Sequence, residues 1–227
     1  MRRSLTLDPK RTALLLVDFQ EEQRVVPEYT VANFAAVLAN ALSLLAAARD
    51  RGLPVIFAAY KRDFDKVPPR PLEHLGAGGK AAFSDKSSPL TAICRELAPR
   101  KDEPVLLKND ASAFCEGELD PILKNAATEW LIVCGVWTEA CVAATVRDAI
   151  DRGIRVLLVK DACGSGTVAM HQTGILNLAN RLYGGAVAST ATARRLLEGD
   201  AADVWVAERP VPLLFTYHDA EALFDSL

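Results

Sequence analysis

The sequence predicts an α/β protein in which a parallel β-sheet lies between two layers of helices. Two observations carry this prediction. Short apolar runs recur along the chain, and most are followed by a stretch with the pattern of a helix. The runs are continuously apolar rather than alternating, which is typical of parallel strands covered on both faces. We therefore expect a three-layer α/β/α architecture.

Six strands are expected, and each is short. The first, TALLLVD, ends in an aspartate, and the last, GAVAST, leads directly into a helical stretch. In chain order the six expected strands are residues 12–18, 54–60, 104–108, 130–136, 155–161 and 185–190.

The expected helices fall between these strands. The helix at 30–51 is followed by Gly52 and the helix at 138–152 by Gly153, and glycine is the residue that most often adopts the left-handed conformation at a helix end. The remaining expected helices are residues 117–127, 168–183 and 190–198.

Two segments depart from the alternation. Residues 61–103 are too long for a plain crossover, so we expect a lid or pocket wall, with a helix capped by Ser88 and carrying Pro89 in its first turn. Residues 200–227 are too short for a second domain. We therefore expect one domain over 1–199 and a C-terminal arm over 200–227 that packs on the domain or on a neighbouring subunit.

Composition excludes several classes of function. Half of the 227 residues are hydrophobic, the net charge is -3 and no basic cluster occurs, which argues against nucleic acid as a partner. The apolar run at 13–17 is too short for a signal peptide, and the one at 31–48 is interrupted by polar residues, so we expect no membrane span.

The five cysteines include no CxxC pair, which favours reduced thiols and a cytoplasmic location. The stretch GSGTVA at 164–169 lacks the third glycine of a dinucleotide fingerprint, and we expect no cofactor.

Three reactive residues fall at the carboxyl ends of expected strands. Asp18 closes the first strand, Lys108 closes the third, and Cys141 opens the helix after the fourth. Active sites of open parallel sheets form at this edge, near the point where strand order reverses. Taken singly, each residue also fits a structural role, as a turn residue, a solvated strand end or a small buried side chain. Their coincidence at one edge predicts a catalytic site.

The segments LLLVDFQ, LLKNDASAF and LIVCGVWTEACVAATVRDAIDRGIRVLLVKDAC resemble the isochorismatase-like cysteine hydrolases. This family includes nicotinamidases, N-carbamoylsarcosine amidohydrolases and ureidoacrylate or biuret hydrolases. The resemblance extends from about residue 11 to 198, and its specific part is the stretch from Gly135 to Val142.

The resemblance implies a six-stranded parallel sheet of order 3-2-1-4-5-6, which places the first and fourth strands side by side. It also implies an Asp–Lys–Cys triad formed by Asp18, Lys108 and Cys141. The peptide bond between Val136 and Trp137 is expected to be cis, and the backbone amides of Trp137 and Cys141 are expected to form an oxyanion hole. A homo-oligomer, either a dimer or a tetramer, is implied as well. The candidates for the substrate pocket are Phe19, Gln23, Tyr60, Phe114 and Trp137.

The implied chemistry is the hydrolysis of a C–N bond in a small amide, carbamoyl or ureido compound through a thioester. An ordinary cysteine has a pKa near 8.5, so only a few per cent is thiolate at neutral pH. We expect Lys108 and the start of the helix to favour the Cys141 thiolate, and Asp18 to accept the thiol proton.

Two departures from the family pattern narrow the expectation. The stretch YKRDFDKVPPRPLEHL contains Asp63, Asp65 and His74 but does not reproduce the Asp-x-His metal motif of nicotinamidases, so we expect no metal. Gln23 stands where family members often have an aromatic residue. This favours a smaller or more polar amide over nicotinamide.

Two alternatives remain open. The isochorismatase branch of the family cleaves a vinyl ether by acid catalysis from the aspartate, and its members can lack the cysteine. A non-catalytic oligomeric binding protein could also retain this fold.

Overall fold

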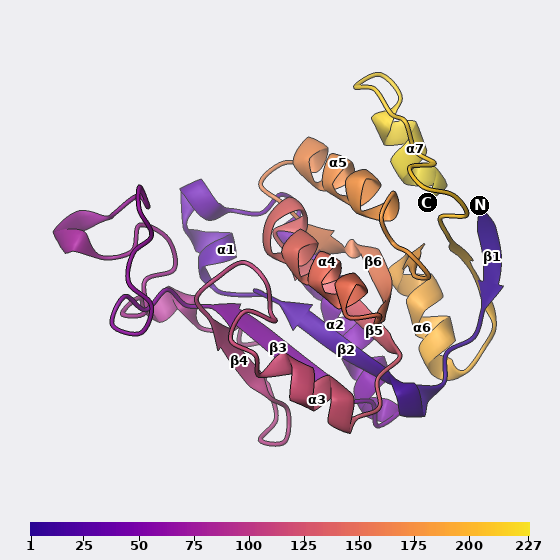
Figure 1. Ribbon diagram of the computed structural model, residues 1–227, viewed down its shortest axis with the longest axis horizontal. Helices are drawn as coiled ribbons and strands as arrows, with labels where there is room; N and C mark the ends of the chain where they lie inside the picture. The colour runs from indigo at the N-terminus through magenta and orange to yellow at the C-terminus, as the bar shows by residue number, and fades with distance from the viewer.

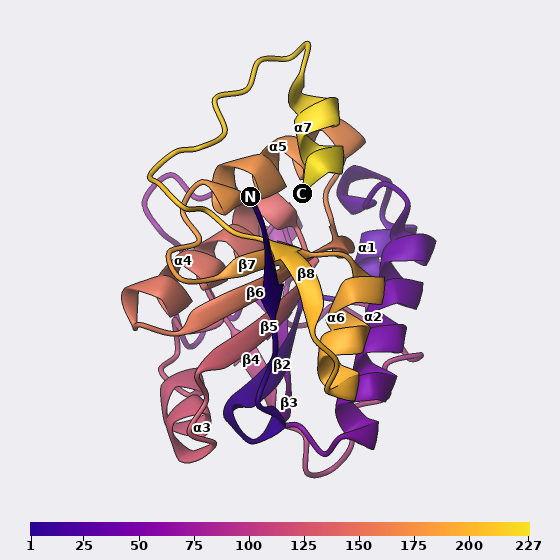
Figure 2. The same cartoon turned by 90° about the vertical axis from the view of Figure 1, so that its right-hand side faces the viewer.

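An eight-stranded sheet forms the centre of the protein and separates two layers of helices (Figures 1 and 2). The computed structural model describes all residues, 1–227. Along the sheet the strand order is β1-β8-β7-β6-β5-β2-β3-β4. The strands are β1 (Arg2–Leu5), β2 (Thr12–Val17), β3 (Val55–Tyr60), β4 (Val105–Lys108), β5 (Trp130–Val136), β6 (Arg155–Gly164), β7 (Ala186–Ala188) and β8 (Ala202–Trp205).

The prediction of six strands was wrong, because two more strands extend the sheet. The run β4-β3-β2-β5-β6-β7 is parallel throughout and corresponds to the six expected segments. The short strand β8 pairs antiparallel with β7, and β1 pairs antiparallel with β8. β1 has the sequence RRSL and is largely exposed, so it carries no apolar run that pattern analysis could detect.

Helices cover both faces of the sheet, as the apolar strands require. α2 and α6 lie on one face, and α3, α4 and α5 lie on the other (Figure 2). All six residues of β2 are buried, because this central strand is covered on both sides. The helices are α1 (Glu22–Val25), α2 (Phe34–Asp50), α3 (Leu119–Asn125), α4 (Ala143–Asp151), α5 (Val168–Ala179), α6 (Thr190–Glu198) and α7 (Ala220–Ser226).

The segment 61–103 contains no α-helix and forms a lobe at one end of the sheet (Figure 1). Ser88 caps the following residues as expected, but only a 3-10 turn, Pro89–Thr91, forms there. Ala92 is extended, and the chain then pairs with the turn after β2, where the Cys94 amide donates to the Phe19 carbonyl at 2.8 Å. These tertiary contacts replace the helix that the cap predicted.

Residues 200–227 lie on the body of the domain. They contribute β8 to the sheet, and α7 packs on α5 (Figure 1). Lys160 Nζ donates to the Phe224 carbonyl at 2.7 Å and lies over the Phe224 ring, which holds α7 against β6. No helix in the structure is both long and apolar enough to cross a bilayer.

Candidate active site

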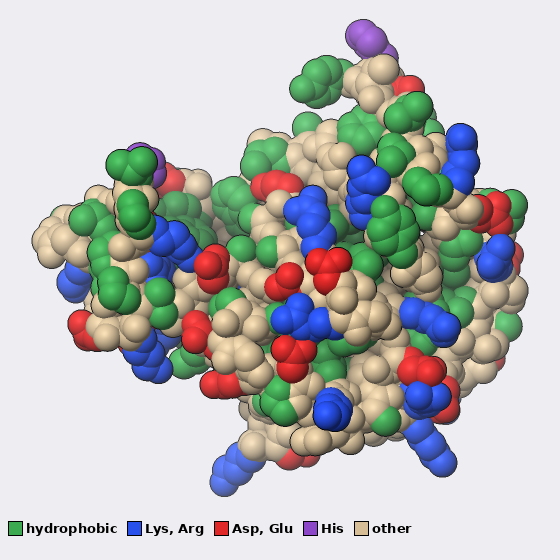
Figure 3. Space-filling view, in the orientation of Figure 1, with side chains coloured by type: hydrophobic (Ala, Val, Ile, Leu, Met, Phe, Trp, Pro, Cys, Tyr) green, Lys and Arg blue, Asp and Glu red, His purple; other side chains and the backbone are tan.

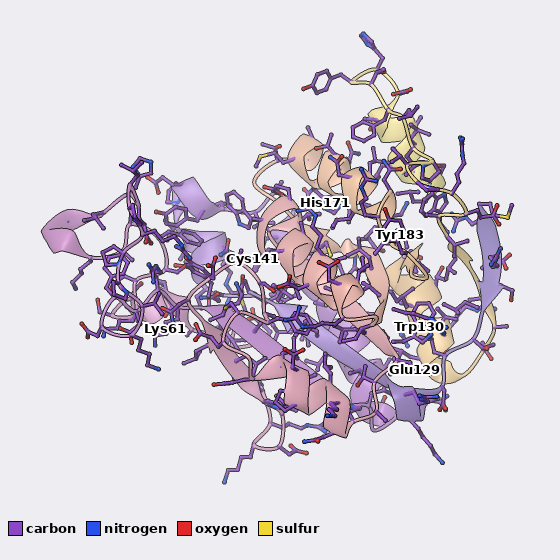
Figure 4. The ribbon with its side chains drawn as sticks, in the orientation of Figure 1. Lys61, Glu129, Trp130, Cys141, His171 and Tyr183 are labelled. Carbon is purple, nitrogen blue, oxygen red and sulfur yellow. The ribbon has the colours of Figure 1, made fainter.

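Asp18, Lys108 and Cys141 come together at the carboxyl edge of the sheet. Asp18 directly follows β2, Lys108 is the last residue of β4, and Cys141 lies in the turn after β5. β2 is the strand from which the chain continues to β3 on one side and later to β5 on the other, so the three residues surround the switch point. Figure 4 shows Cys141 where the body of the domain meets the 61–103 segment.

Asp18 and Lys108 form a buried ion pair. Lys108 Nζ lies 2.8 Å from Asp18 Oδ2, and the two side chains are 1% and 3% exposed. Lys108 also donates to the Asp110 carbonyl at 3.1 Å and lies 4.7 Å from the centre of the Tyr60 ring. Burial raises the pKa of Asp18, although the charge of Lys108 opposes this shift. Burial alone would lower the pKa of Lys108, but Asp18 and Cys141 reverse the direction and the pKa is raised.

Cys141 does not have the activated thiol that we expected. Its pKa is raised, first by burial and then by the negative charge of Asp18, and these effects outweigh the opposing effect of Lys108. The helix start contributes less than expected because Cys141 lies in a π-helical turn, Thr138–Val142, and the regular helix α4 begins only at Ala143. The resting residue is therefore a thiol, with a carboxylate beside it that can accept its proton.

The turn that carries Cys141 is fixed by several bonds. The Val136–Trp137 peptide bond is cis, and the Trp137 carbonyl accepts from the amides of Ala140 and Val142 at 3.0 and 3.2 Å. The amide of Trp137 itself donates to no other group of the protein. Gln23 Oε1 accepts from the Trp137 indole Nε1 at 2.8 Å.

Thr138 ties the same turn to β6 and α5. Its hydroxyl donates to the Gly164 carbonyl at 3.0 Å and lies 2.8 Å from His171 Nδ1, so the imidazole donates to it. Burial lowers the pKa of His171 to about 4 and keeps the ring neutral. His171 supports the turn and lies behind it on α5 (Figure 4).

A cavity of about 360 Å³ opens beside the Cys141 thiol. Three of the candidate pocket residues line it, namely Gln23, Tyr60 and Trp137. Phe19 and Phe114 do not line it, and this part of the prediction was wrong. Phe19 is 2% exposed and packs in the core on the α2 side, whereas Phe114 is 3% exposed and packs in the core on the α4 side. An aromatic residue beside a reactive one in sequence can still point into the core, because neighbouring side chains leave the backbone in different directions.

Glu28, Tyr29 and Phe83 also line this cavity; sequence analysis did not name them singly, although it expected the 61–103 segment, which carries Phe83, to form a pocket wall. Tyr29 ends a 3-10 turn after α1, and Phe83 belongs to the 61–103 segment. An aromatic residue within a polar loop, as at Tyr29 and Phe83, was the feature of the sequence that could have pointed to them. A larger cavity of about 700 Å³ lies between α4 and α5, but none of the three triad residues lines it.

Two buried polar residues brace the site. Gln20 Nε2 donates to the carbonyls of Tyr60 and Thr91 at 2.9 Å each, and its Oε1 accepts from the Tyr60 amide. Glu22 is hydrogen-bonded to the Ser84 hydroxyl. Burial raises the pKa of Glu22 to about 7, so this contact between α1 and the 61–103 segment involves a carboxyl group that titrates near neutrality.

Asp63, Asp65 and His74, the residues nearest to a metal motif in the sequence, do not form a metal site. Asp63 and Asp65 both form ion pairs with Lys86, and His74 is exposed. No group of three or more His, Cys, Asp or Glu side chains in the structure could hold a metal ion. Cys115 is exposed and does not line the cavity beside Cys141.

Comparisons with known proteins agree with the α/β fold. Residues 12–192 match the Isochorismatase domain family model. Maleamate amidohydrolase from Pseudomonas putida is 30% identical over 187 residues, which cover 78% of this chain and 83% of the relative. Ureidoacrylate amidohydrolase RutB from Acinetobacter baylyi is 25% identical over 203 residues, which cover 77% and 80% of the two chains. The solved structure of a cysteine hydrolase from Pseudomonas syringae pv. phaseolicola superposes with a TM-score of 0.76 at 25% identity, covering 86% of this chain and 95% of that one. This chain therefore belongs to the isochorismatase family of hydrolases.

Proposed function

We propose that the protein is a cysteine hydrolase that cleaves the C–N bond of a small amide, carbamoyl or ureido compound. The observation that carries the proposal is a cavity lined by both a buried carboxylate and a thiol, with a buried ammonium paired to the carboxylate. Amidohydrolases among the relatives support the reaction class.

In the first half of the reaction, Asp18 takes the thiol proton as Cys141 Sγ attacks the carbonyl carbon of the substrate. The raised pKa of Cys141 favours proton transfer during the attack over a thiolate formed beforehand. The unpaired amide of Trp137, together with that of Cys141, stabilises the tetrahedral oxyanion, and such donors typically contribute about 3 kcal/mol each.

In the second half, Asp18 returns the proton to the leaving nitrogen, and the C–N bond breaks to give a thioester and ammonia or an amine. A water molecule then attacks the thioester while Asp18 accepts its proton, and this proton passes to the Cys141 sulfur as the carboxylic acid leaves. Lys108 keeps Asp18 ionised between the two steps, since burial alone would favour the protonated acid.

The test is ammonia release from a panel of small amides, ureido acids and carbamoyl compounds. We expect wild type and Cys115→Ala to release ammonia, because Cys115 is exposed and lies outside the cavity. Cys141→Ala should reduce the release to the background rate. Turnover by Cys141→Ala at the wild-type rate would refute the thioester mechanism. Release of pyruvate from isochorismate, without ammonia from any amide, would instead assign the protein to vinyl-ether hydrolysis.

We also propose that the protein forms a homo-oligomer. Leu214 and Tyr217 of the C-terminal segment are 82% and 98% exposed, and Figure 3 shows a part of the molecule at the top projecting beyond the body. Sedimentation analysis should give a mass of at least twice the monomer, and a monomer at micromolar concentration would contradict the proposal.

A further inference from the structure

Four aromatic side chains and one carboxylate surround the cavity beside Cys141. The aromatic residues are Tyr29, Tyr60, Phe83 and Trp137, and the carboxylate that adds to the Asp18–Lys108 pair is Glu28. In the space-filling view, hydrophobic side chains gather where the lobe joins the body (Figure 3). An enclosure of rings with an acidic group beside it is the chemistry that binds organic cations in proteins.

The four rings are held in place before any ligand binds. The Tyr29 hydroxyl donates to the Ala82 carbonyl at 2.6 Å, and the Trp137 indole donates to Gln23. Phe83 packs edge-on against Tyr29 with ring centres 4.6 Å apart, and its centre lies 5.5 Å from that of Tyr60. Rings fixed by such contacts lose little further freedom on binding, which favours affinity.

The charges around the cavity favour a positive ligand. Asp18 and Lys108 neutralise each other, whereas Glu28 takes part in no ion pair. Arg70 interacts with the Tyr60 hydroxyl outside the cavity lining and forms an exposed ion pair with Asp110 at 2.8 Å.

Two basic residues of the nearby segment are held by carboxylates. Arg62 binds Glu73 at 2.7 Å, and Lys86 binds Asp63 at 2.6 Å. No arginine lines the cavity, and its one lysine neighbour is already paired. A substrate with a carboxylate would therefore meet Glu28 without a compensating charge.

We infer that this enzyme acts on amides whose acyl part carries a compact organic cation, such as a quaternary ammonium group. The aromatic walls take the place of water around the cation, and Glu28 supplies the opposing charge at the exposed side. This inference rests on the proposed amide hydrolysis and specifies its substrate class. The reaction is otherwise unchanged, since the cationic group does not take part in bond cleavage.

The test compares three amides of similar size. The first is 2-(trimethylammonio)acetamide, the second is its neutral isostere 3,3-dimethylbutanamide, and the third is the anion maleamate. The quaternary group also makes its amide intrinsically more reactive, so dissociation constants are measured with Cys141→Ala by calorimetry, in addition to kcat/KM of the wild type. We expect the cation to bind about tenfold more tightly than the isostere, and maleamate to bind more weakly than either.

Two variants probe the two sources of the preference. Glu28→Gln, made in the Cys141→Ala background, should reduce the ratio of the two affinities about threefold to fivefold and weaken its dependence on salt. Phe83→Leu keeps an apolar wall but removes one ring, and it should reduce the ratio about threefold. Glu118→Gln, an identical charge change at an exposed residue outside the cavity, should leave the ratio unchanged.

The outcomes separate the two proposals. Hydrolysis of neutral amides with equal binding of cation and isostere would overturn the cationic specificity and leave the amidase intact. Preferential binding of the cation without ammonia from any amide would overturn the hydrolysis and leave a cation-binding cavity. Preferential hydrolysis of maleamate would overturn the charge argument directly.

Discussion

The buried pair of Asp18 and Lys108 gives a quantitative prediction about stability. At 2.8 Å and an effective dielectric constant of 20, Coulomb's law gives an attraction of about 6 kcal/mol before the cost of desolvation. Asp18→Asn leaves a buried ammonium, and Lys108→Met leaves a buried carboxylate. The remaining ammonium can lose a proton and the remaining carboxylate can gain one, and the free energy of that protonation change limits the loss of unfolding free energy. At pH 7 this limit is about 5 kcal/mol for a lysine with an ordinary pKa of 10.4, and about 4 kcal/mol for an aspartate with one of 3.9.

We therefore expect each single variant to lose about 4 kcal/mol of unfolding free energy at pH 7, or roughly 10 °C in Tm. The double variant should be much closer to wild type than the two losses combined, because no uncompensated charge remains. The penalty of Lys108→Met should fall to about 1.5 kcal/mol at pH 5, where protonation of Asp18 requires little free energy.

The assay is urea unfolding followed by tryptophan fluorescence, at pH 5 and pH 7, with the double-mutant cycle evaluated at each pH. The exposed pair Arg194–Glu198 serves as a control and should show a coupling energy below about 0.5 kcal/mol. Additive losses in the Asp18 and Lys108 variants, or a Lys108→Met penalty independent of pH, would refute the reasoning.

Three further predictions concern single residues. Burial raises the pKa of Glu22 from 4.5 to about 7, so its contribution to stability is complete below pH 4.5 and is lost as pH rises through 7. Glu22→Gln should remove about 2 kcal/mol of this pH dependence of the unfolding free energy in urea titrations. An unchanged pH dependence in the variant would show that Glu22 is not its source. The pKa of His171 is lowered from 6.5 to about 4, so its contribution is present above pH 6.5 and is lost as pH falls through 4; the deficit of His171→Asn relative to wild type should shrink between pH 7 and pH 4.5. Gly135→Ala would place a Cβ 2.2 Å from the Val17 carbonyl oxygen and should lower the free energy of unfolding by about 3 kcal/mol. Gly153→Ala has open space around the new Cβ and should lower it by about 1 kcal/mol in the same thermal unfolding assay. Equal losses in the two variants would disprove the steric argument.

The parallel part of the sheet was predictable because its strands are buried on both faces. A run such as Trp130–Val136 must then be apolar at every position, and this pattern is visible in the letters. β1 was not predictable, because an edge strand needs few apolar residues and its pairing depends on another short segment about 200 residues away. β8 lies between β1 and β7 and has only four residues, too few for a recognisable apolar run. The helix expected after Ser88 failed for a related reason, since a cap is a local signal and the contact of Cys94 with Phe19 is not.

In the candidate site, sequence analysis placed the reacting groups better than it placed their surroundings. Asp18, Lys108 and Cys141 follow strand ends, and strand ends of a parallel sheet meet at one edge. The direction of the Cys141 pKa shift could not be predicted from the sequence, because burial and the nearby Asp18 charge, which both raise the pKa, depend on tertiary packing. The ring of Phe83 reaches the cavity through a long irregular loop, and no periodicity governs such a path.

The candidate catalytic residues and part of the cavity wall come from different parts of the chain, which bears on how the substrate range of this family could be engineered. Asp18 and Lys108 lie at strand ends and Cys141 lies in the turn after β5, whereas Phe83 comes from a segment that joins β3 to β4 without an α-helix of its own. Exchange of residues 61–103 between homologues should therefore change the part of the selectivity that depends on Phe83, whereas the part that depends on Glu28 should remain with the body of the domain. In such a protein, substitutions in the loops can change which substrate fits the cavity while the cysteine stays the same.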